Sequence, residues 1–525
     1  MQAEAAAARA RGEALDAPAR LTLVQAEAAA ALPGVFVTLS SDVLPQIKEF
    51  ERFSTTAVNA YVGPVVSRYL GRLRGRLDEA GYDGPVFVIL SHGGVAPVEE
   101  AARLAVGTAL SGPAGGVAAA VALARAGLGQ NLVTFDMGGT STDIALVAEG
   151  DAALGRGRVV GGERIALESL DIVTLGAGGG SIAHLGSGGT LQVGPQSAGA
   201  VPGPAAYGLG GTQPAVTDAN LVLGYLDAAN FLGGARRLDL PAAQRAVAAL
   251  AETLNLAPAD CAMGIHRLVN ARMADGVRVA TVRRGVDPRD FTLLAFGGAA
   301  GLHASAVARE LGLQRAAVPL FAAGLSAWGM LQSDLRYEMA RSTLAAGGMP
   351  EDSEIAALYA ALEAEARAKM AAWYGGEIAV QRSADMRYGE QVFEVAVPLD
   401  DMDWTSPNLA QRLRDAFHAR HRALFTYDLP EEEVVLVTAR AAAIGRLPPL
   451  ASASRAEGPP AAPHATRRIR LEAGEVDAPV YTFEALAPGQ ALRGPAIVES
   501  ATTTVLLLPG DTAAMDGRGW LEITL

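Results

Sequence analysis

The stretch that decides the fold runs Val133-Thr-Phe-Asp136-Met-Gly138-Gly139-Thr140-Ser141-Thr142-Asp143-Ile-Ala-Leu-Val147. Apolar residues on both sides predict two strands, and the two glycines permit a tight turn that brings backbone N–H groups close to an anion. The hydroxyls of Thr140, Ser141 and Thr142 can donate to phosphate oxygens. Asp136 and Asp143 suit a magnesium ion, which is usually held through one or two carboxylates plus phosphates. A plain Gly-Thr hairpin with a capping aspartate is the alternative interpretation.

The neighbouring segments favour the phosphate loop over the plain hairpin. A small-residue helix beginning Ser111-Gly112-Pro113-Ala114-Gly115-Gly116-Val117 precedes it, and Leu294-Ala295-Phe296-Gly297-Gly298 follows far downstream. Gly297 and Gly298 would let the backbone approach a flat ring, and the helix after them would present its N-terminus to anionic groups. A plain strand-to-helix turn is the alternative there. The order of these pieces resembles the second lobe of the actin/sugar-kinase fold.

Two further features are candidates for the same cleft. The loop Gly176-Ala-Gly178-Gly179-Gly180-Ser181 is flexible and suited to anions, although it could equally be a packing turn. His303 follows the Gly297-Gly298 turn and is a candidate catalytic or metal-binding residue, with a satisfied structural histidine as the alternative. Asp218 opens a predicted helix, which it could cap instead of facing the site.

The amino-acid composition limits the classes of protein to which the chain can belong. The chain has 525 residues, half of them hydrophobic and 19% charged, and its formal net charge is -13. The acidic balance argues against a nucleic-acid partner, and no apolar run reaches the ~18 residues of a membrane-spanning helix. The first residues lack the apolar centre of a secretory signal. One cysteine, Cys261, excludes an intrachain disulfide framework. We therefore expect a soluble cytoplasmic protein with no nucleic-acid and no membrane partner.

Strands and helices alternate along most of the chain, which predicts an α/β class. Helices are expected at 241–254 and at 260–284. After residue 378 the sequence pattern predicts mainly short strands and turns. The predicted domains are residues 1–50, a remnant of an N-terminal lobe; residues 51–343, a nucleotide-binding domain; and residues 350–525, a C-terminal domain.

Sequence blocks spread over residues 35–340 carry a specific resemblance. They occur in this order: Arg52-Phe-Ser-Thr-Thr56, Ser111-Gly-Pro-Ala-Gly-Gly-Val117, Asp136-Met-Gly-Gly-Thr-Ser-Thr-Asp143, Gly176-Ala-Gly-Gly-Gly-Ser-Ile-Ala183, Val193-Gly-Pro-Gln-Ser-Ala-Gly199, Thr217-Asp-Ala-Asn220, Arg284-Gly-Val-Asp-Pro288 and Gly297-Gly298. The run resembles the hydantoinase A/oxoprolinase family, which includes N-methylhydantoinase and the ATP-dependent acetone and acetophenone carboxylase subunits. The tail, with Gly494-Pro-Ala-Ile-Val-Glu499, resembles the C-terminal domain of that family.

The resemblance implies an actin-like ATPase (ribonuclease H-like) lobe followed by a smaller α+β C-terminal domain. It implies ATP-dependent hydrolysis of a cyclic amide, a hydantoin or oxoproline, through phosphorylation of the carbonyl oxygen, with ATP and Mg²⁺ as cofactors. Asp136 and Asp143 would hold the metal and act in catalysis with His303. The nucleotide would be bound by Gly138, Gly139, Thr140, Ser141, Thr142, Gly178, Gly179, Gly297 and Gly298. The implied partner is a hydantoinase B-type subunit. A ketone carboxylase subunit and a truncated non-catalytic fragment are the alternative interpretations.

The chain departs from the family pattern in two places. Family members open with an N-terminal lobe that has its own Asp-x-Gly-Gly-Thr loop, and no such loop precedes Asp136. We therefore expect either that a separate chain supplies this lobe or that the chain is truncated. Ala206 stands where related chains often carry cysteine, so no thiol chemistry is assigned there.

Overall fold

The structure, a computed structural model, describes residues 26–28, 30–155, 157–343, 347–389, 391–405, 407–448 and 455–525. Half of the predicted 1–50 remnant lies outside these residues. The chain forms two units, each assembled from several segments. The first comprises Met1–Ser111, Gly155–Ser169 and Ser333–Pro448, and the second comprises Gly112–Leu154, Leu170–Gln332 and Pro449–Leu525. The boundaries at 51–343 and 350–525 stay a prediction.

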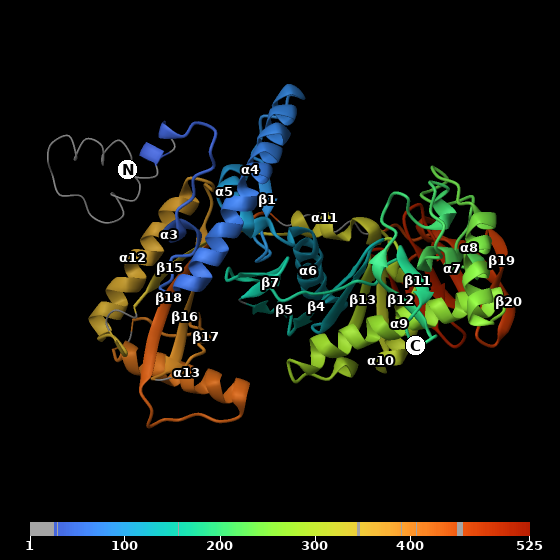
Figure 1. The fold of residues 1–525 in the computed structure, drawn as a ribbon. Helices are drawn as coiled ribbons and strands as arrows, with labels where there is room; N and C mark the ends of the chain where they lie inside the picture. Colours follow the sequence, from blue (N-terminus) through green and yellow to red (C-terminus); the bar gives the residue numbers. More distant parts are fainter. Residues whose placement is uncertain are drawn as a thin grey trace. The chain divides into compact units, whose positions relative to one another are not determined.

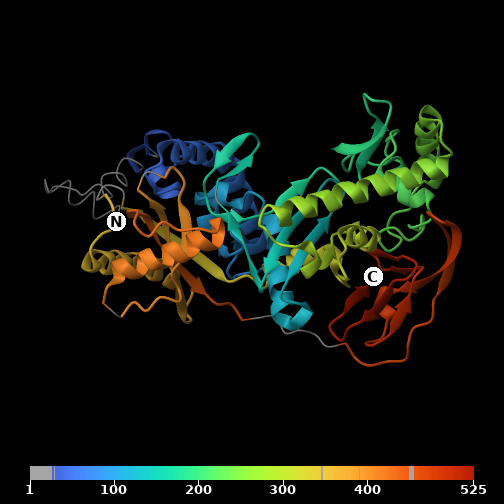
Figure 2. The same ribbon diagram turned by 90° about the horizontal axis from the view of Figure 1, so that it is seen from below.

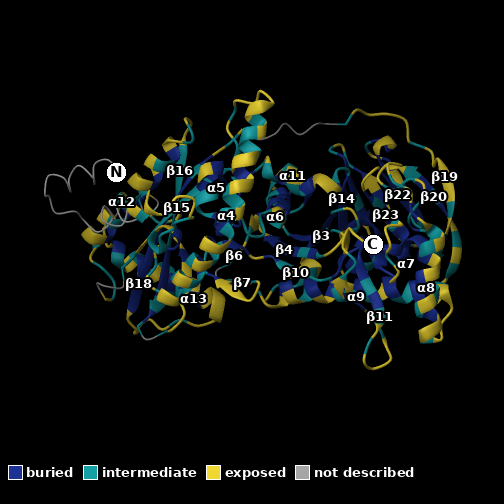
Figure 3. Cartoon of the chain, turned by 45° about the horizontal axis from the view of Figure 1, so that its top comes forward, coloured by how far each residue is buried: buried dark blue, intermediate teal, exposed yellow. Residues whose placement is uncertain are grey.

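The second unit is built on a nine-stranded sheet in the order β10-β4-β3-β13-β14-β25-β24-β21, with β5 (Asp151–Ala152) paired to β4. Strand β10 (Val173–Leu175) lies at one end of this order, and it is followed by β4 (Thr142–Ala148), β3 (Leu132–Met137), β13 (Thr292–Phe296) and β14 (Arg315–Pro319). Strand β13 runs parallel to β3 and β14, whereas β4 runs antiparallel to β3. In Figure 3 β3 and β4 are dark blue over most of their length, as expected for strands buried on both faces.

Helices cover this sheet on both sides. Figure 1 shows α6 (Ser111–Leu123) and α11 (Leu325–Met330) on one side of β3 and β13, and α9 (Pro258–Val282) and α10 (Ala304–Leu311) on the other. Helices α7 (Val216–Val222) and α8 (Leu240–Leu254) pack against α9. The α/β class and the actin-like lobe predicted from sequence are confirmed, and helices α8 and α9 form where periodicity placed them.

The C-terminal segment, drawn in red in Figure 2, extends the same unit. Strand β25 (Trp520–Thr524) pairs antiparallel with β14, and β24 (Thr512–Met515) and β21 (Ala491–Arg493) continue the sheet. A separate four-stranded sheet contains β19 (Ala465–Leu471), β20 (Gly474–Thr482), β22 (Ala496–Glu499) and β23 (Thr504–Leu507). This segment therefore shares a sheet with the predicted phosphate turn.

The first unit has a six-stranded sheet in the order β1-β2-β15-β18-β16-β17. Its strands are β1 (Phe87–Ile89), β2 (Val95–Pro97), β15 (Leu335–Ser342), β16 (Ile378–Tyr388), β17 (Val395–Pro398) and β18 (Val434–Gly445). Helices α12 (Asp352–Ala371) and α13 (Leu409–Phe425) pack on this sheet over a core that includes Tyr359, Met386 and Phe417. Helix α4 (Glu49–Glu79) belongs to the same unit. No helix among the described residues is long and apolar enough to cross a bilayer.

Candidate functional site

The two aspartates of the deciding stretch face each other across a β-hairpin. Asp136 on β3 is the direct cross-strand partner of Asp143 on β4. Directly opposed residues of an antiparallel pair project from the same face of the sheet, so the two carboxylates lie side by side. The turn between them is closed by a hydrogen bond that Gly138 N donates to Ser141 O at 3.1 Å. Gly139 and Thr140 are exposed at its tip.

A second glycine loop lies directly against this turn. Gly179 N donates to Gly138 O at 3.0 Å, and Gly180 N donates to Gly139 O at 2.6 Å. A Cβ placed on Gly178 would lie 2.8 Å from the carbonyl carbon of Thr140, closer than real Cβ contacts come. The loop therefore requires glycine at 178 because two backbones touch there. The structure brings together Gly178, Gly179 and the turn, as the sequence suggested.

The third glycine turn comes from the end of β13. Gly297 has a φ of +85°, and a Cβ there would lie 2.6 Å from Asp136 Oδ1. Ala299 N donates to Met137 O at 3.1 Å, which fixes this turn against the end of β3. Because β3 and β13 are parallel, their carboxyl ends meet at one edge of the sheet, the edge at which α/β folds bind ligands. Three glycine turns thus converge around Asp136.

The electrostatics at this edge favour a bound cation. Burial, together with the negative charge of Asp143, raises the pKa of Asp136 to about 6. Ser326 Oγ donates to Asp136 Oδ2 at 3.3 Å and opposes the rise. Thr174 Oγ1 donates to Asp143 Oδ1 at 2.5 Å. A divalent cation would relieve the repulsion between the two carboxylates, and two carboxylates plus phosphates are the usual protein ligands of Mg²⁺. No cluster of three or more His, Cys, Asp or Glu residues that could hold a metal occurs among the described residues.

Ser326 reaches Asp136 because two helices pack unusually closely. A Cβ on Gly115 of α6 would lie 2.5 Å from Ser326 O on α11, and one on Gly116 would lie 3.1 Å from Ser326 Oγ. Gly329 on α11 must also be glycine for the two helices to pack this closely, because a Cβ placed on it would collide with Gly115 O. Sequence reasoning identified Gly115 and Gly116 but missed Ser326. The signal that could have found it is the pair of small residues, which marks a close helix–helix approach.

Thr142 does not join the exposed part of the turn. Its side chain is fully buried, and its hydroxyl donates to Ala177 O at 2.6 Å. Thr142 and Asp143 are successive residues of β4, so their side chains project from opposite faces of the strand. These contacts give Thr142 a role in holding the second glycine loop and do not support the phosphate contact predicted from sequence. For exposed Thr140 and half-buried Ser141, the phosphate contact stays a prediction.

His303 lies in a buried polar network. Its ring is fully buried, with Nδ1 2.6 Å from Asn270 Oδ1 and Nε2 3.2 Å from Asn220 Nδ2. It stacks on His266 at 4.7 Å between ring centroids, and burial holds the pKa of His303 well below its usual range. A neutral, fully hydrogen-bonded imidazole between α7, α9 and α10 argues against the catalytic role suggested by the sequence. The structural alternative accounts for it.

Asp218 is likewise structural. Its fully buried carboxylate accepts hydrogen bonds from the backbone N–H groups of Ala205, Ala206 and Ala215 at 3.1, 2.7 and 2.8 Å. The last of these caps the start of α7, which is the capping interpretation left open by the sequence. Its neighbour Thr217 does reach the candidate site region, because its hydroxyl donates to Gly179 O at 2.8 Å.

The family profiles, the related sequences and the related structure all indicate the same family. Residues 52–339 match the Hydantoinase/oxoprolinase family profile, and residues 350–524 match that of the Hydantoinase/oxoprolinase C-terminal domain. The chain is similar to caprolactamase subunit alpha of Pseudomonas jessenii, with 40% identity over 94% of this chain and 73% of the relative. It is 30% identical to the acetone carboxylase beta subunit of Xanthobacter autotrophicus over 92% of this chain and 70% of the relative. The crystal structure of ATP-dependent caprolactamase from Pseudomonas jessenii superposes with a TM-score of 0.81 and 38% identity, covering 97% of this chain and 75% of that chain.

Proposed function

Because the chain belongs to the hydantoinase/oxoprolinase family, we propose that it is the nucleotide-binding subunit of an enzyme that uses ATP to hydrolyse a cyclic amide. The observation that carries the proposal is the convergence of three glycine turns on the paired carboxylates of Asp136 and Asp143. A neutral packing turn needs no such pair, whereas a magnesium-bound triphosphate needs both the exposed N–H groups and the charge.

The proposed roles follow from position. The exposed backbone of Gly139 and the hydroxyls of Thr140 and Ser141 bind the phosphates, and Gly138 closes the turn through the hydrogen bond from its N–H to Ser141 O. Asp136 and Asp143 hold Mg²⁺, which when bound neutralises phosphate charge. Gly178 and Gly179 pack against the turn, Gly297 packs against Asp136, and Gly298 is the glycine proposed to meet the nucleoside. These residues mainly position groups and stabilise charge, which is what phosphoryl transfer requires of a protein.

The chemistry addresses the poor reactivity of an amide. Resonance makes the carbonyl carbon of a lactam a weak electrophile. Transfer of the γ-phosphoryl group forms an O–P bond at the carbonyl oxygen and releases ADP. A first water then adds to the activated carbon and the ring C–N bond breaks, which frees the amine and leaves an acyl phosphate. A second water adds to the carbonyl carbon of this acyl phosphate, and its C–O bond to phosphate breaks as inorganic phosphate leaves. The products are the ring-opened amino acid, ADP and phosphate. We propose a hydantoinase B-type subunit as partner for the hydrolytic step, in line with the relatives named as subunits.

The test is ATP turnover by the chain with its candidate partner over a panel of lactams, hydantoins and oxoproline. We expect substrate-dependent ADP release that the Asp136→Ala variant loses. The exposed Glu252→Gln variant on α8 is the control and should retain it. Unchanged turnover in Asp136→Ala would overturn the metal assignment, and absence of turnover with every partner and substrate would favour the non-catalytic alternative.

Ketone carboxylation is the second candidate. The specific observation in its favour is the similarity to an acetone carboxylase subunit, in sequence and in a nucleotide-free structure with a TM-score of 0.78 at 26% identity. The same ATP site would then phosphorylate an enolate oxygen. ATP turnover that requires bicarbonate and a ketone, with none on cyclic amides, would select this candidate.

A further inference from the structure

Helix α4 packs against the first unit through one of its faces. Thr55, Asn59 and Leu70 are buried on that face. The opposite face, which we call the outer face, starts with residues spaced three or four apart, a spacing that keeps them on one side of a helix: Phe50, Phe53, Ala57 and Tyr61. All four are exposed, Phe50 by 71% and Tyr61 by 85%. Exposed rings gathered in one patch mark an interaction site.

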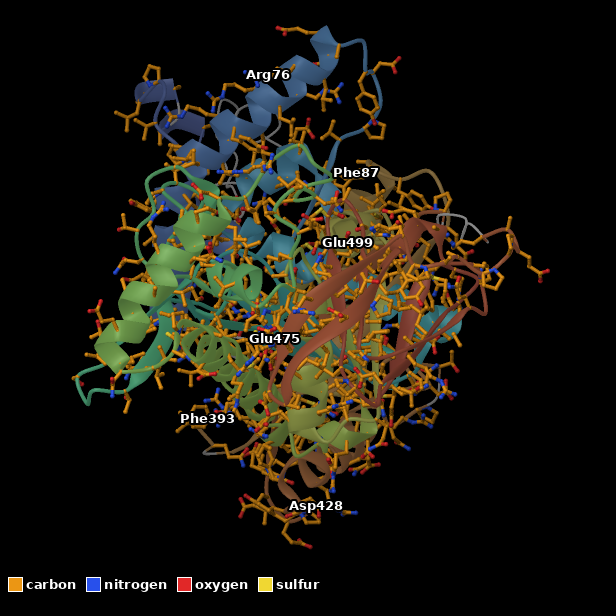
Figure 4. All side chains as sticks on the ribbon, turned by 90° about the vertical axis from the view of Figure 1, so that its right-hand side faces the viewer. Arg76, Phe87, Phe393, Asp428, Glu475 and Glu499 are labelled. Atoms are coloured by element: carbon orange, nitrogen blue, oxygen red, sulfur yellow. The ribbon has the colours of Figure 1, made fainter. Side chains whose placement is uncertain are left out.

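The outer face continues into a notch without side chains. Gly71 and Gly75 follow along it, and a Cβ placed on either would meet no described atom within 4 Å. Packing inside the described chain therefore does not require glycine at these positions, although glycine inside a helix is less favourable than alanine. Two such glycines, one helical turn apart, leave room for another backbone or a large ring to approach closely. Figure 4 labels Arg76 beside this notch, and both that view and Figure 1 show the last turns of α4 projecting beyond the sheet of the same unit.

The bulky and the small halves of the outer face complement each other when two copies of the helix lie antiparallel. With a two-fold axis level with residues 62–63, each residue faces the one that lies equally far on the other side of the axis in the second copy. Phe50 then faces Gly75, so that a ring enters the notch. Phe53 faces Arg72, and a guanidinium over an aromatic ring is a favourable contact. Each of these contacts occurs twice, once for each copy.

Charge and area agree with the same arrangement. Glu49 of one copy faces Arg76 of the other, so opposite charges meet at both ends of the pair. Phe50, Phe53 and Tyr61 together expose roughly 400 Å², taking about 200 Å² for a whole aromatic side chain. Two copies contribute roughly 800 Å² from these rings alone, and the apolar stems of the arginines add enough to pass the ~1,000 Å² that a specific interface needs.

We propose that the chain forms a homodimer through the outer face of α4, with the two helices antiparallel and related by a two-fold axis. The aromatic half of each helix fills the glycine notch of the other. The partner is therefore a second copy of this chain, bound through one self-complementary surface. This inference goes beyond the proposed function and does not depend on nucleotide binding at the Asp136 turn.

Sedimentation velocity of the full chain over a range of concentrations tests the proposal. We expect a reversible dimer of the unmodified chain in the micromolar range. The double substitution Gly71→Leu with Gly75→Leu fills the notch and should weaken dimerisation at least tenfold. At concentrations where both proteins are monomeric it should not lower the unfolding temperature, because leucine favours a helix more than glycine does and the notch is open. Ala249→Leu, at an exposed position of α8, is the matched control and should leave the dimer unchanged.

Charge exchange tests the antiparallel arrangement separately. Glu49→Arg and Arg76→Glu should each weaken the dimer roughly fivefold, because each removes two ion pairs and brings like charges together. The variant that carries both changes should regain most of the affinity, since the opposite charges then meet in exchanged positions. A parallel pair would not show this rescue, because Glu49 would face Glu49.

A monomer at every concentration up to about 100 μM overturns the proposal. A dimer that the double glycine substitution leaves unchanged overturns it as well, and so does a charge exchange without rescue. If the unmodified chain is monomeric and the glycine variant instead loses binding to a candidate partner subunit, the outer face belongs to that subunit and the second copy is excluded. Should the glycine variant fail to fold, the charge-exchange series still decides the question.

Discussion

The Asp136→Asn substitution should make the ligand-free protein more stable at neutral pH while removing function. Burial and the charge of Asp143 raise the pKa of Asp136 from 3.8 to about 6. The ionised carboxylate is therefore disfavoured in the folded state relative to the unfolded chain. A rise of roughly two pKa units corresponds to about 3 kcal/mol at pH values above both pKa values. Asparagine has the shape of the protonated acid and removes this cost.

The pH dependence gives the prediction its sign. Because the folded-state pKa is raised, the penalty is nearly absent below the unfolded value, grows as the pH rises through both values, and is complete above about 6. The variant should therefore unfold at a higher temperature than the unmodified chain at about pH 8, and the difference should shrink towards zero near pH 4. Calorimetric unfolding in the presence of a chelator measures this difference, and the exposed Glu252→Gln variant should show no such trend.

Addition of Mg²⁺ with ADP should reverse the order of stability. A cation bound by both carboxylates removes their repulsion, so the unmodified chain gains stability that the Asp136→Asn variant lacks. The reasoning is refuted if Asp136→Asn is less stable than the unmodified chain at about pH 8, or if its gain is the same at every pH.

Two further substitutions test the geometry around the turn. Gly178→Ala forces a Cβ to within 2.8 Å of the Thr140 backbone and should reduce ATP turnover at least tenfold. The control is Gly188→Ala, whose Cβ would meet nothing within 4 Å, and it should leave turnover unchanged. Equal activity of the two variants would contradict the close contact. Ser326→Ala removes the hydrogen bond that favours the charged form of Asp136, so the pKa of Asp136 should rise further. The acidic limb of the kcat/KM profile should move to higher pH, and an unmoved limb would show that Ser326 does not act through Asp136.

The sequence predicted the parts of the site that depend on local chemistry. Asp136, Gly138, Gly139 and Asp143 could be identified because a strand, a glycine turn and a returning strand are contiguous, and a cross-strand register follows from a short turn. The same alternation along β4 could have excluded Thr142, since Asp143 and Thr142 cannot face the same side. The phosphate contact predicted for Thr142 rested on its hydroxyl group alone and not on the direction in which its side chain projects from the strand.

Other features depend on contacts between distant segments. Ser326 is 190 residues from Asp136, and no local pattern near it indicates a site. The surroundings of His303 come from three helices, although the i, i+4 spacing of His266 and Asn270 on α9 does mark a buried polar face. The two units are also assembled from segments far apart in the sequence, such as Gly112–Leu154 and Pro449–Leu525 in the second unit, and no local pattern indicates which of these segments associate.

The shared sheet explains why the C-terminal segment should matter to nucleotide binding rather than merely accompany it. Strand β14 is buried along most of its length and lies between β13, which carries the Gly297 turn, and β25. Without β25, the N–H and C=O groups along one edge of β14 would lose their partners at an apolar strand, an arrangement that folded proteins avoid. The same segment places Thr504 O so close to Gly301 that a Cβ there would lie 2.5 Å away. The helix that follows the Gly297-Gly298 turn is therefore positioned by C-terminal backbone. A change in this segment should accordingly alter nucleotide affinity even where it touches no phosphate.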